Sequence, residues 1–233
     1  LLTASEEGDH IILPRNAHCS FYGGMVLSGA MPIYMQSKIE PDLGVVMAAS
    51  SSEADACLSS NPDAAAVFIT SPSFFGSCSD INAIKAAAAG RGKDVLVDEA
   101  HGGHFPFHPD YPVPALRQGA AAVVNGLHKN WPVLNQGACL HVSQSFKKCE
   151  RLRQVISMLT TTSPSYPLLA SIETARLFME KDGRNYLDQA MNLSREYKAR
   201  INAIKGLICY SDELINKAAG ITGLDPLKIL IST

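Results

Sequence analysis

The sequence contains no long hydrophobic run and no strong excess of charge of either sign. No apolar stretch approaches the roughly 20 residues that a membrane-spanning helix requires. The formal net charge is -2, so the chain as a whole has no field that would attract nucleic acid or an acidic membrane surface. We therefore expect no nucleic-acid partner and no membrane association.

The sequence also lacks the cysteine spacings that are typical of metal sites and disulfide frameworks. Its six cysteines are scattered, and no two of them form a C-x-x-C pair. In a chain of this size, such spacing favours reduced thiols. Because reduced thiols are typical of the cytoplasm, we expect a cytoplasmic protein.

The sequence is rich in short apolar segments. Hydrophobic residues make up 46% of the 233 residues, which is enough for a large core. Apolar runs without alternation predict strands that are buried on both faces, and the helical stretches between them predict a mostly parallel α/β sheet. The predicted strands are residues 11–13, 31–35, 66–70, 95–98, 121–124 and 139–142. The predicted helices are residues 18–27, 55–60, 80–89 and 114–118.

The character of the sequence changes after Ser143. Three helices are predicted at residues 146–159, 166–179 and 186–204, and strands follow at residues 207–210 and 227–231. We interpret residues 1–165 as a large domain without its N-terminal part. Residues 166–233 would be connecting helices and the start of a truncated C-terminal domain. A first residue other than methionine and a strand-like end also indicate a fragment of a longer protein.

Residues that can carry chemistry follow the predicted strands. Ser71, Asp98 and the pair His128 and Lys129 each come just after an apolar run, and ligands of parallel α/β sheets bind at the carboxyl ends of the strands. A cofactor with a pyridinium nitrogen needs a carboxylate at one end and a lysine amine at the other, as Asp98 and Lys129 would provide. We expect Lys129 to be buried, since burial makes an amine nucleophilic. The alternative is a solvated surface lysine.

The histidines allow more than one interpretation. His101, His104 and His108 have a spacing that can supply metal ligands. However, their segment contains glycines and prolines that indicate a loop, and no cysteine is near, so we expect no metal site. His104 and His108 would then fill space or bind backbone. His18 either caps a helix, lies in the core or stacks on a cofactor ring, and its position alone does not decide.

Four segments, taken together and in order, resemble the Orn/Lys/Arg decarboxylase family. Residues 15–20 (RNAHCS) resemble its RN-x-H-x-S segment, and residues 69–76 (ITSPSFFG) are similar to its TxPTYYG segment. Residues 98–105 (DEAHGGHF) resemble DEAHGxHF. Residues 126–142 are similar to the segment HK-x-x-x-x-L-x-Q-x-x-x-LHV around the cofactor lysine. The resemblance implies a three-layer α/β/α large domain of the pyridoxal-phosphate transferase type, which is fold type I.

The resemblance also implies catalytic roles for three residues. Lys129 matches the lysine that carries pyridoxal 5'-phosphate as a Schiff base. Asp98 matches the carboxylate that pairs with the pyridine nitrogen. His128 matches the histidine beside that lysine, near the phosphate and the reacting carbon. Either His128 or Lys129 would return a proton to the α-carbon.

Further residues match positions around the cofactor. His18 matches the histidine that stacks on the ring, and Ala100 and His101 match positions at its other side and edge. Ser71 lies in a motif near the cofactor. The implied cofactor-binding set is therefore Lys129, Asp98, His18, Ala100, His101, His128 and Ser71.

The activity implied by the resemblance is decarboxylation of a basic amino acid to an amine and carbon dioxide. Lysine, arginine and ornithine are the candidate substrates, and the sequence does not choose among them. Polyamine metabolism and a homodimer or higher homo-oligomer are also implied. The alternatives are another fold-type I enzyme (an aminotransferase, lyase or desulfurase) and an inactive fragment.

Overall fold

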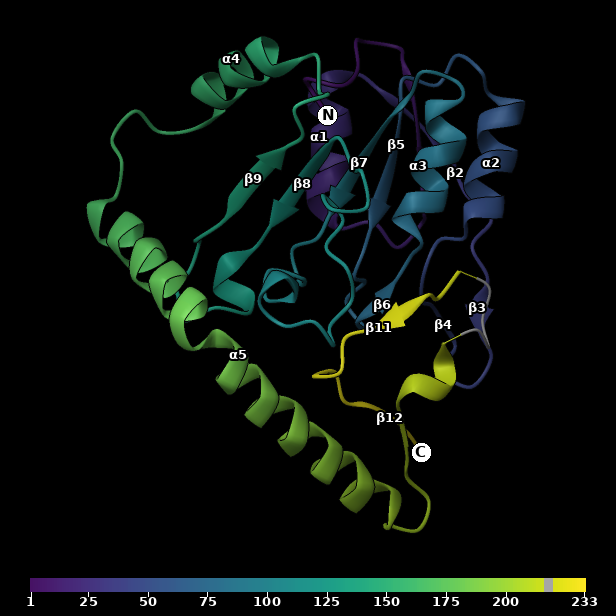
Figure 1. Ribbon diagram of the computed structural model, residues 1–233. Helices are drawn as coiled ribbons and strands as arrows, with labels where there is room; N and C mark the ends of the chain where they lie inside the picture. The colour runs from purple at the N-terminus through teal and green to yellow at the C-terminus, as the bar shows by residue number, and fades with distance from the viewer. Residues whose placement is uncertain (216–219) are drawn as a thin grey trace.

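A six-stranded sheet forms the centre of the computed structural model, which describes residues 1–215 and 220–233 (Figure 1). The strand order is β2-β1-β5-β7-β8-β9, with β9 antiparallel to β8 and the other neighbours parallel. The predicted mostly parallel sheet is therefore confirmed. The strands are β1 (His10–Leu13), β2 (Met31–Tyr34), β5 (Ala66–Thr70), β7 (Asp94–Asp98), β8 (Ala122–Asn125) and β9 (Cys139–Val142).

Helices cover both faces of this sheet, which gives the predicted three layers. On one face, Leu58 and Ile84 from two adjacent helices pack against Val67. On the other face, Phe21 packs against Ile11. Consecutive side chains of a strand point to opposite faces, so continuous apolar runs become buried when both faces are covered. The helices are α1 (Cys19–Ser28) on one face and α2 (Ser51–Ser60) and α3 (Ile81–Ala89) on the other.

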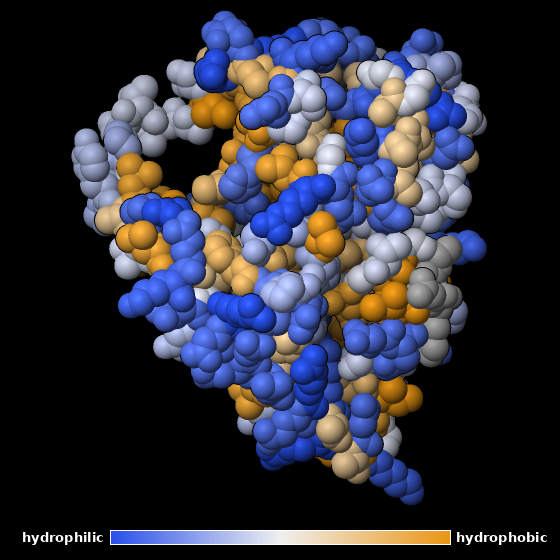
Figure 2. Space-filling model, viewed as in Figure 1, coloured by the Kyte–Doolittle hydropathy of each residue, from blue (hydrophilic) through white to orange (hydrophobic). Residues whose placement is uncertain are grey.

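Part of the α1 face remains open over β8 and β9. Val124, Leu140 and Val142 are 43%, 38% and 38% exposed. Helix α4 (Cys149–Leu159) stands away from the sheet here, and Figure 2 shows an opening beside it that hydrophobic side chains border. The predicted helix at 146–159 begins three residues late, because the Phe146 amide closes a turn with Ser143 instead.

A single long helix, α5 (Tyr166–Asn202), replaces two of the predicted helices. The expected break between residues 179 and 186 was wrong. Met179, Gly183, Leu187 and Met191 recur every four residues on one buried stripe, and Met179 packs against the position where Gly183 has no side chain. Burial of that stripe outweighs the cost of about 1 kcal/mol for glycine within a helix. No described helix, α5 included, is long and apolar enough to cross a membrane.

Two shorter predictions also need correction. Residues 114–118 form hydrogen-bonded turns rather than a helix, because Gly119 adopts a left-handed φ of 94° and ends the segment after one turn. Helix α2 begins at Ser51 and not at residue 55, since Ser50 and Glu53 form a capping box. That capping box is a sequence signal for an earlier start.

The C-terminal segment folds back onto the sheet domain. Strand β11 pairs antiparallel with β6, far upstream in sequence, and β10 pairs with β12. The strand predicted at 227–231 begins only at Leu230, because Lys228 closes a turn on Asp225. The division at residue 165 remains a prediction. The remaining elements are β3 (Ile39–Glu40), β4 (Val45–Val46), β6 (Ser77–Cys78), β10 (Ile208–Tyr210), β11 (Gly223–Leu224), β12 (Leu230–Ser232) and the 3-10 turns η1 (Phe105–Phe107), η2 (Leu127–Lys129) and η3 (Asp212–Leu214).

Candidate active site

The ends of β5, β7 and β8 bring the predicted catalytic segments to one edge of the sheet. Thr70 is paired with Asp98, and Asp98 with Val124, in the parallel register. Beyond the strands, the Ser71 amide donates to the Asp98 carbonyl at 3.0 Å. The prediction that Asp98 and Lys129 follow adjacent strands is confirmed.

Asp98 presents a half-buried carboxylate to an open cavity of about 770 Å³. Its Oδ1 accepts a hydrogen bond of 3.0 Å from the amide of Ala100, which fixes the carboxylate at the strand end. The apolar side chains of Phe21, Phe68 and Val124 line the same cavity. No ion pair engages Asp98 within the described residues, so its charge is available to a cationic ligand.

Lys129 is exposed, and the expectation of a buried lysine was wrong. It ends the short turn η2, in which Leu127 is buried and Lys129 projects beyond the strand ends. Its Nζ lies 3.3 Å from Nε2 of His101. A side chain at Gly126 would meet the Lys129 stem at 3.2 Å, so this glycine leaves room for it.

His101 is a half-buried neutral imidazole. Burial, together with the charges of Lys129 and Lys228, lowers its pKa to about 4. At neutral pH its Nε2 therefore accepts a hydrogen bond from the Lys129 amine. Its ring and the Phe74 ring form a T-shaped pair, with 5.8 Å between ring centroids.

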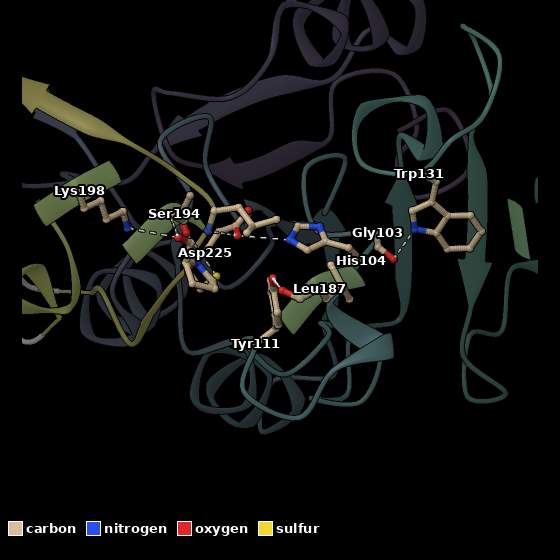
Figure 3. A network of polar contacts seen from close by, with 12 residues as sticks. Gly103, His104, Tyr111, Trp131, Leu187, Ser194, Lys198 and Asp225 are labelled. Carbon is tan, nitrogen blue, oxygen red and sulfur yellow. Dashed lines mark hydrogen bonds and ion pairs between the residues drawn. The ribbon is translucent and has the colours of Figure 1, made fainter. Parts of the chain in front are cut away.

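The loops that carry these two residues are tied together. Trp131 Nε1 donates to the Gly103 carbonyl at 2.9 Å (Figure 3). His128 also holds the second loop, because its Nδ1 lies 2.9 Å from the Gly137 carbonyl and, as a donor, leaves Nε2 as an acceptor. His128 is half-buried beside Lys129.

Glu99 and Asn125 form a hydrogen-bonded pair at the same edge of the sheet. Asn125 Nδ2 donates to the Glu99 carbonyl at 2.9 Å and to Glu99 Oε2 at 3.2 Å, and the Ala115 amide donates to Oε1 at 2.7 Å. Burial raises the pKa of Glu99 to about 7, although both hydrogen bonds oppose the shift. We did not single out Glu99 from the sequence, although it lies within the DEAHGGHF segment.

The two remaining polar candidates are engaged within the protein. His18 is exposed and is the N-cap of α1, where its Nδ1 accepts from the Ser20 amide at 3.2 Å. The capping interpretation is therefore confirmed, and stacking on a ring stays a prediction. Ser71 is buried, and its hydroxyl accepts a 3.1 Å hydrogen bond from the Ser79 amide.

The three histidines of the loop point to different partners. His101 contacts Lys129, His104 Nε2 lies 3.3 Å from Asp225 Oδ1, and His108 Nε2 lies 2.9 Å from Asp188 Oδ1. They do not converge on one point. His104 and His108 tie the loop to these carboxylates. His108 also binds backbone as expected, because its Nδ1 accepts from the Asp110 amide at 3.2 Å.

Lys228, Asp225 and Phe74 were missed by sequence reasoning. Lys228 and Asp225 come from the C-terminal segment, and both affect the charge environment of His101. No local pattern in the sequence signals this, because the contacts depend on how the chain returns after α5. Phe74 lies in the segment ITSPSFFG, where the sequence pointed to Ser71 alone.

The donor set fits the ring and the aldehyde end of pyridoxal phosphate. Asp98, which no cation of the described residues pairs with, supplies a carboxylate for a pyridinium, and Lys129 supplies an exposed amine beyond the neighbouring strand end. Ala100 lies between them in sequence and is held against Asp98. His18 caps α1, whose next residues Ser20 and Phe21 line the cavity of Asp98.

Comparisons with known proteins show which family the chain belongs to. The family described as "Orn/Lys/Arg decarboxylase, major domain" matches residues 1–233. The chain is 36% identical over 225 residues to arginine decarboxylase of Bacillus subtilis (strain 168), covering 97% of this chain and 46% of that protein. It therefore spans about half the length of the curated relatives it matches. Lysine decarboxylase LdcA of Pseudomonas aeruginosa is 20% identical over 220 residues, covering 84% of this chain and 29% of that protein.

Solved structures show the same fold. Lysine decarboxylase A from Pseudomonas aeruginosa superposes with a TM-score of 0.79 at 18% identity, covering 99% of this chain and 38% of that one. The constitutive lysine decarboxylase of E. coli gives a TM-score of 0.77 at 18% identity, with 99% and 37% covered. The predicted three-layer α/β/α class is thus confirmed.

Proposed function

The chain belongs to the Orn/Lys/Arg decarboxylase family, and on that premise we propose that it forms the cofactor-binding part of a pyridoxal-phosphate-dependent decarboxylase of a basic amino acid. One observation carries the proposal: Asp98 and Lys129 follow adjacent parallel strands and face the same edge of the sheet. A carboxylate and an amine in this relation suit the two ends of the pyridoxal group.

Each candidate residue has a role in holding that group. Lys129 Nζ would hold the group through its aldehyde carbon, and the Asp98 carboxylate would keep its ring nitrogen protonated. His18 and Ala100 would lie against the two faces of the ring, with His101 at its edge. Ser71 anchors the strand end next to Asp98. When bound, the protonated ring withdraws electrons from the substrate's α-carbon.

The reaction breaks one bond and forms another. The bond between the α-carbon and the carboxylate breaks, carbon dioxide leaves, and its bonding electron pair stays on the α-carbon. One proton then reaches that carbon and gives the amine. The proton comes from Lys129 Nζ, or from His128 when its imidazolium form carries a proton on Nε2. His101 accepts a hydrogen bond from Lys129 at neutral pH and therefore orients that amine.

A spectroscopic experiment tests the cofactor assignment. The full-length protein is mixed with pyridoxal phosphate, and we expect the visible absorbance of lysine-bound cofactor in the wild type and not in Lys129→Ala. An Asp98→Ala variant should bind the cofactor but lose at least about 100-fold in turnover, since the ring loses its counter-charge. Absence of the band from the wild type would rule the proposal out.

Carbon dioxide release decides the reaction type. Arginine is the first substrate to test, because four relatives at 35–36% identity are named arginine decarboxylase; lysine and ornithine follow. Amino-group transfer without carbon dioxide release would indicate an aminotransferase on the same fold. An inactive fragment would give neither.

The family resemblance supports further proposals about the whole protein. These are a homodimer or larger homo-oligomer, a cytoplasmic location and a place in polyamine metabolism. Light scattering of the full-length protein gives the oligomeric state, and a monomer at micromolar concentration would contradict the first of them.

A further inference from the structure

Lys228 lies beside the candidate site although it comes from the C-terminal segment. Its Nζ is 5.5 Å from the centroid of the Phe74 ring, and that ring forms a T-shaped pair with His101. His101 in turn contacts Lys129. A second lysine thus approaches the position at which the cofactor amine lies, and its charge acts on His101.

A buried network holds the segment that carries Lys228 (Figure 3). Asp225 is 1% exposed; its amide donates to the Gly76 carbonyl at 2.9 Å, and its carboxylate pairs with His104. Ser194 and Lys198 of α5 donate to the Pro226 carbonyl at 2.7 and 3.2 Å. Four contacts with α5 and two loops therefore hold residues 225–226, and the Lys228 amide donates to the Asp225 carbonyl at 3.1 Å.

The aliphatic part of the Lys228 side chain packs closely against Gly76. A side chain at Gly76 would meet Lys228 Cγ at 2.5 Å, so the glycine of the SPSFFG turn leaves room for this lysine. The residue is half-buried, so its ammonium group cannot sample solvent freely in all directions.

The charge of Lys228 has no anionic partner. Within the described ranges, no carboxylate lies within 4.0 Å of its Nζ, which lies over the face of the Phe74 ring instead. An aromatic face attracts a cation but does not neutralise it. Lys198 differs, because its ammonium donates to a carbonyl of the protein itself. An ammonium group that is held in position, half-buried and without a carboxylate partner is suited to bind the anionic group of a ligand.

We propose that Lys228 binds the α-carboxylate of the amino-acid substrate, an inference that rests on the proposed function. The α-carboxylate is the anion that a basic amino acid carries next to the amine exchanged at Lys129. The same positive charge repels the ammonium or guanidinium group at the other end of the substrate. Lys228 therefore both attracts the substrate and selects the direction in which it enters.

The test compares how tightly the enzyme binds the substrate amino acid and the product amine. The full-length enzyme loaded with pyridoxal phosphate is titrated with the basic amino acid it decarboxylates, by rapid mixing before product accumulates, and separately with the resulting amine. Cofactor absorbance reports the apparent Kd of each. Lys228→Met and Lys228→Gln should weaken binding of the amino acid by about tenfold or more, as expected for loss of a charge-assisted hydrogen bond. Binding of the amine, which has no carboxylate, should change by less than about threefold.

Two further variants control for charge and for folding. Lys228→Arg keeps the charge and should retain amino-acid binding within about threefold of the wild type. Lys205→Met removes an exposed lysine beyond the end of α5 and should leave both Kd values unchanged. Far-ultraviolet circular dichroism and thermal melting identify a variant that does not fold, and either neutral substitution suffices for the comparison.

Two results would overturn the inference. In one, the neutral variants weaken binding of the amino acid and binding of the amine equally. In the other, they weaken only the binding of pyridoxal phosphate itself, which would assign Lys228 to the phosphate. Failure of the proposed function is a separate result, because the wild type would then show no cofactor band or no carbon dioxide release.

Discussion

His101 Nε2 and Lys129 Nζ lie 3.3 Å apart, although the two residues belong to different loops that follow β7 and β8. Their approach depends on the contact between Trp131 and the Gly103 carbonyl, which joins those loops. An imidazole in this position must stay neutral to accept from an ammonium group, and its burial ensures this. The pair therefore orients the amine that would hold the cofactor.

His101 should make the protein less stable in acid. Its pKa is about 4 in the folded protein but near 6.5 in the unfolded chain, so the unfolded chain binds the proton first as the pH falls. The contribution of neutral His101 is present above about pH 6.5 and is lost as the pH falls towards 4. We expect a loss of about 1–2 kcal/mol after allowance for solvent screening of this half-exposed group.

Urea unfolding of the wild type and His101→Gln between pH 4 and 8 measures this contribution. The stability of the wild type relative to the variant should decrease on acidification. A difference between the two proteins that is constant with pH would contradict the assignment.

Glu99 should make the protein less stable as the pH rises. Burial raises its folded pKa to about 7, above the unfolded value near 4.5, so the folded protein keeps the proton longer as the pH rises. Its contribution is complete below about pH 4.5 and is lost as the pH rises through 7, by about 3 kcal/mol at most. Glu99→Gln removes this titration. The free energy of unfolding of the variant relative to the wild type should therefore rise between pH 5 and 8, and a falling or flat difference would sink the prediction.

Removal of Asp225 should destabilise the protein strongly. Asp225→Ala leaves His104 Nε2 and the Leu227 amide without their acceptor, in a site where both partners of the pair are 1% exposed. We expect a loss of about 2–4 kcal/mol in the free energy of unfolding. Asp225→Asn retains an acceptor oxygen and should cost less. Asp63→Ala, at an exposed loop position, should change stability by no more than about 0.5 kcal/mol; a similarly small loss for Asp225→Ala would refute the role of the pair.

Gly76 and Gly92 form a matched pair for testing how Lys228 is fitted. Both have left-handed φ angles, 89° and 68°, so alanine costs about 1 kcal/mol of backbone strain at either position. Only at Gly76 does the added carbon meet other residues, Lys228 at 2.5 Å and Asp225 at 3.2 Å, whereas nothing lies within 4 Å at Gly92. Gly76→Ala should therefore cost about 1–3 kcal/mol more than Gly92→Ala in urea unfolding. Equal losses would mean that Lys228 moves aside freely.

Local sequence patterns predicted much of the sheet and the outline of the site. The apolar run at 66–70 became β5 without change, and the runs ending at Asp98 and near Lys129 became neighbouring strands. Continuous hydrophobicity predicts such strands because burial on both faces needs no information from distant residues. The capping interpretation of His18 is likewise a property of adjacent residues.

Packing between distant segments decided the rest. The helix α5 passes through Gly183 because a buried stripe outweighs a local preference, and Lys129 is exposed because η2 carries it past the strand ends. The sequence by itself determined the strands, their parallel class and the identity of the chemical groups that follow them. Only the tertiary structure placed Lys228 beside that edge, since the pair of His104 and Asp225 that anchors its segment joins residues 121 positions apart. Such a contact forms only when the whole chain has folded, because its two residues come from distant segments. Short-range sequence patterns therefore cannot predict it.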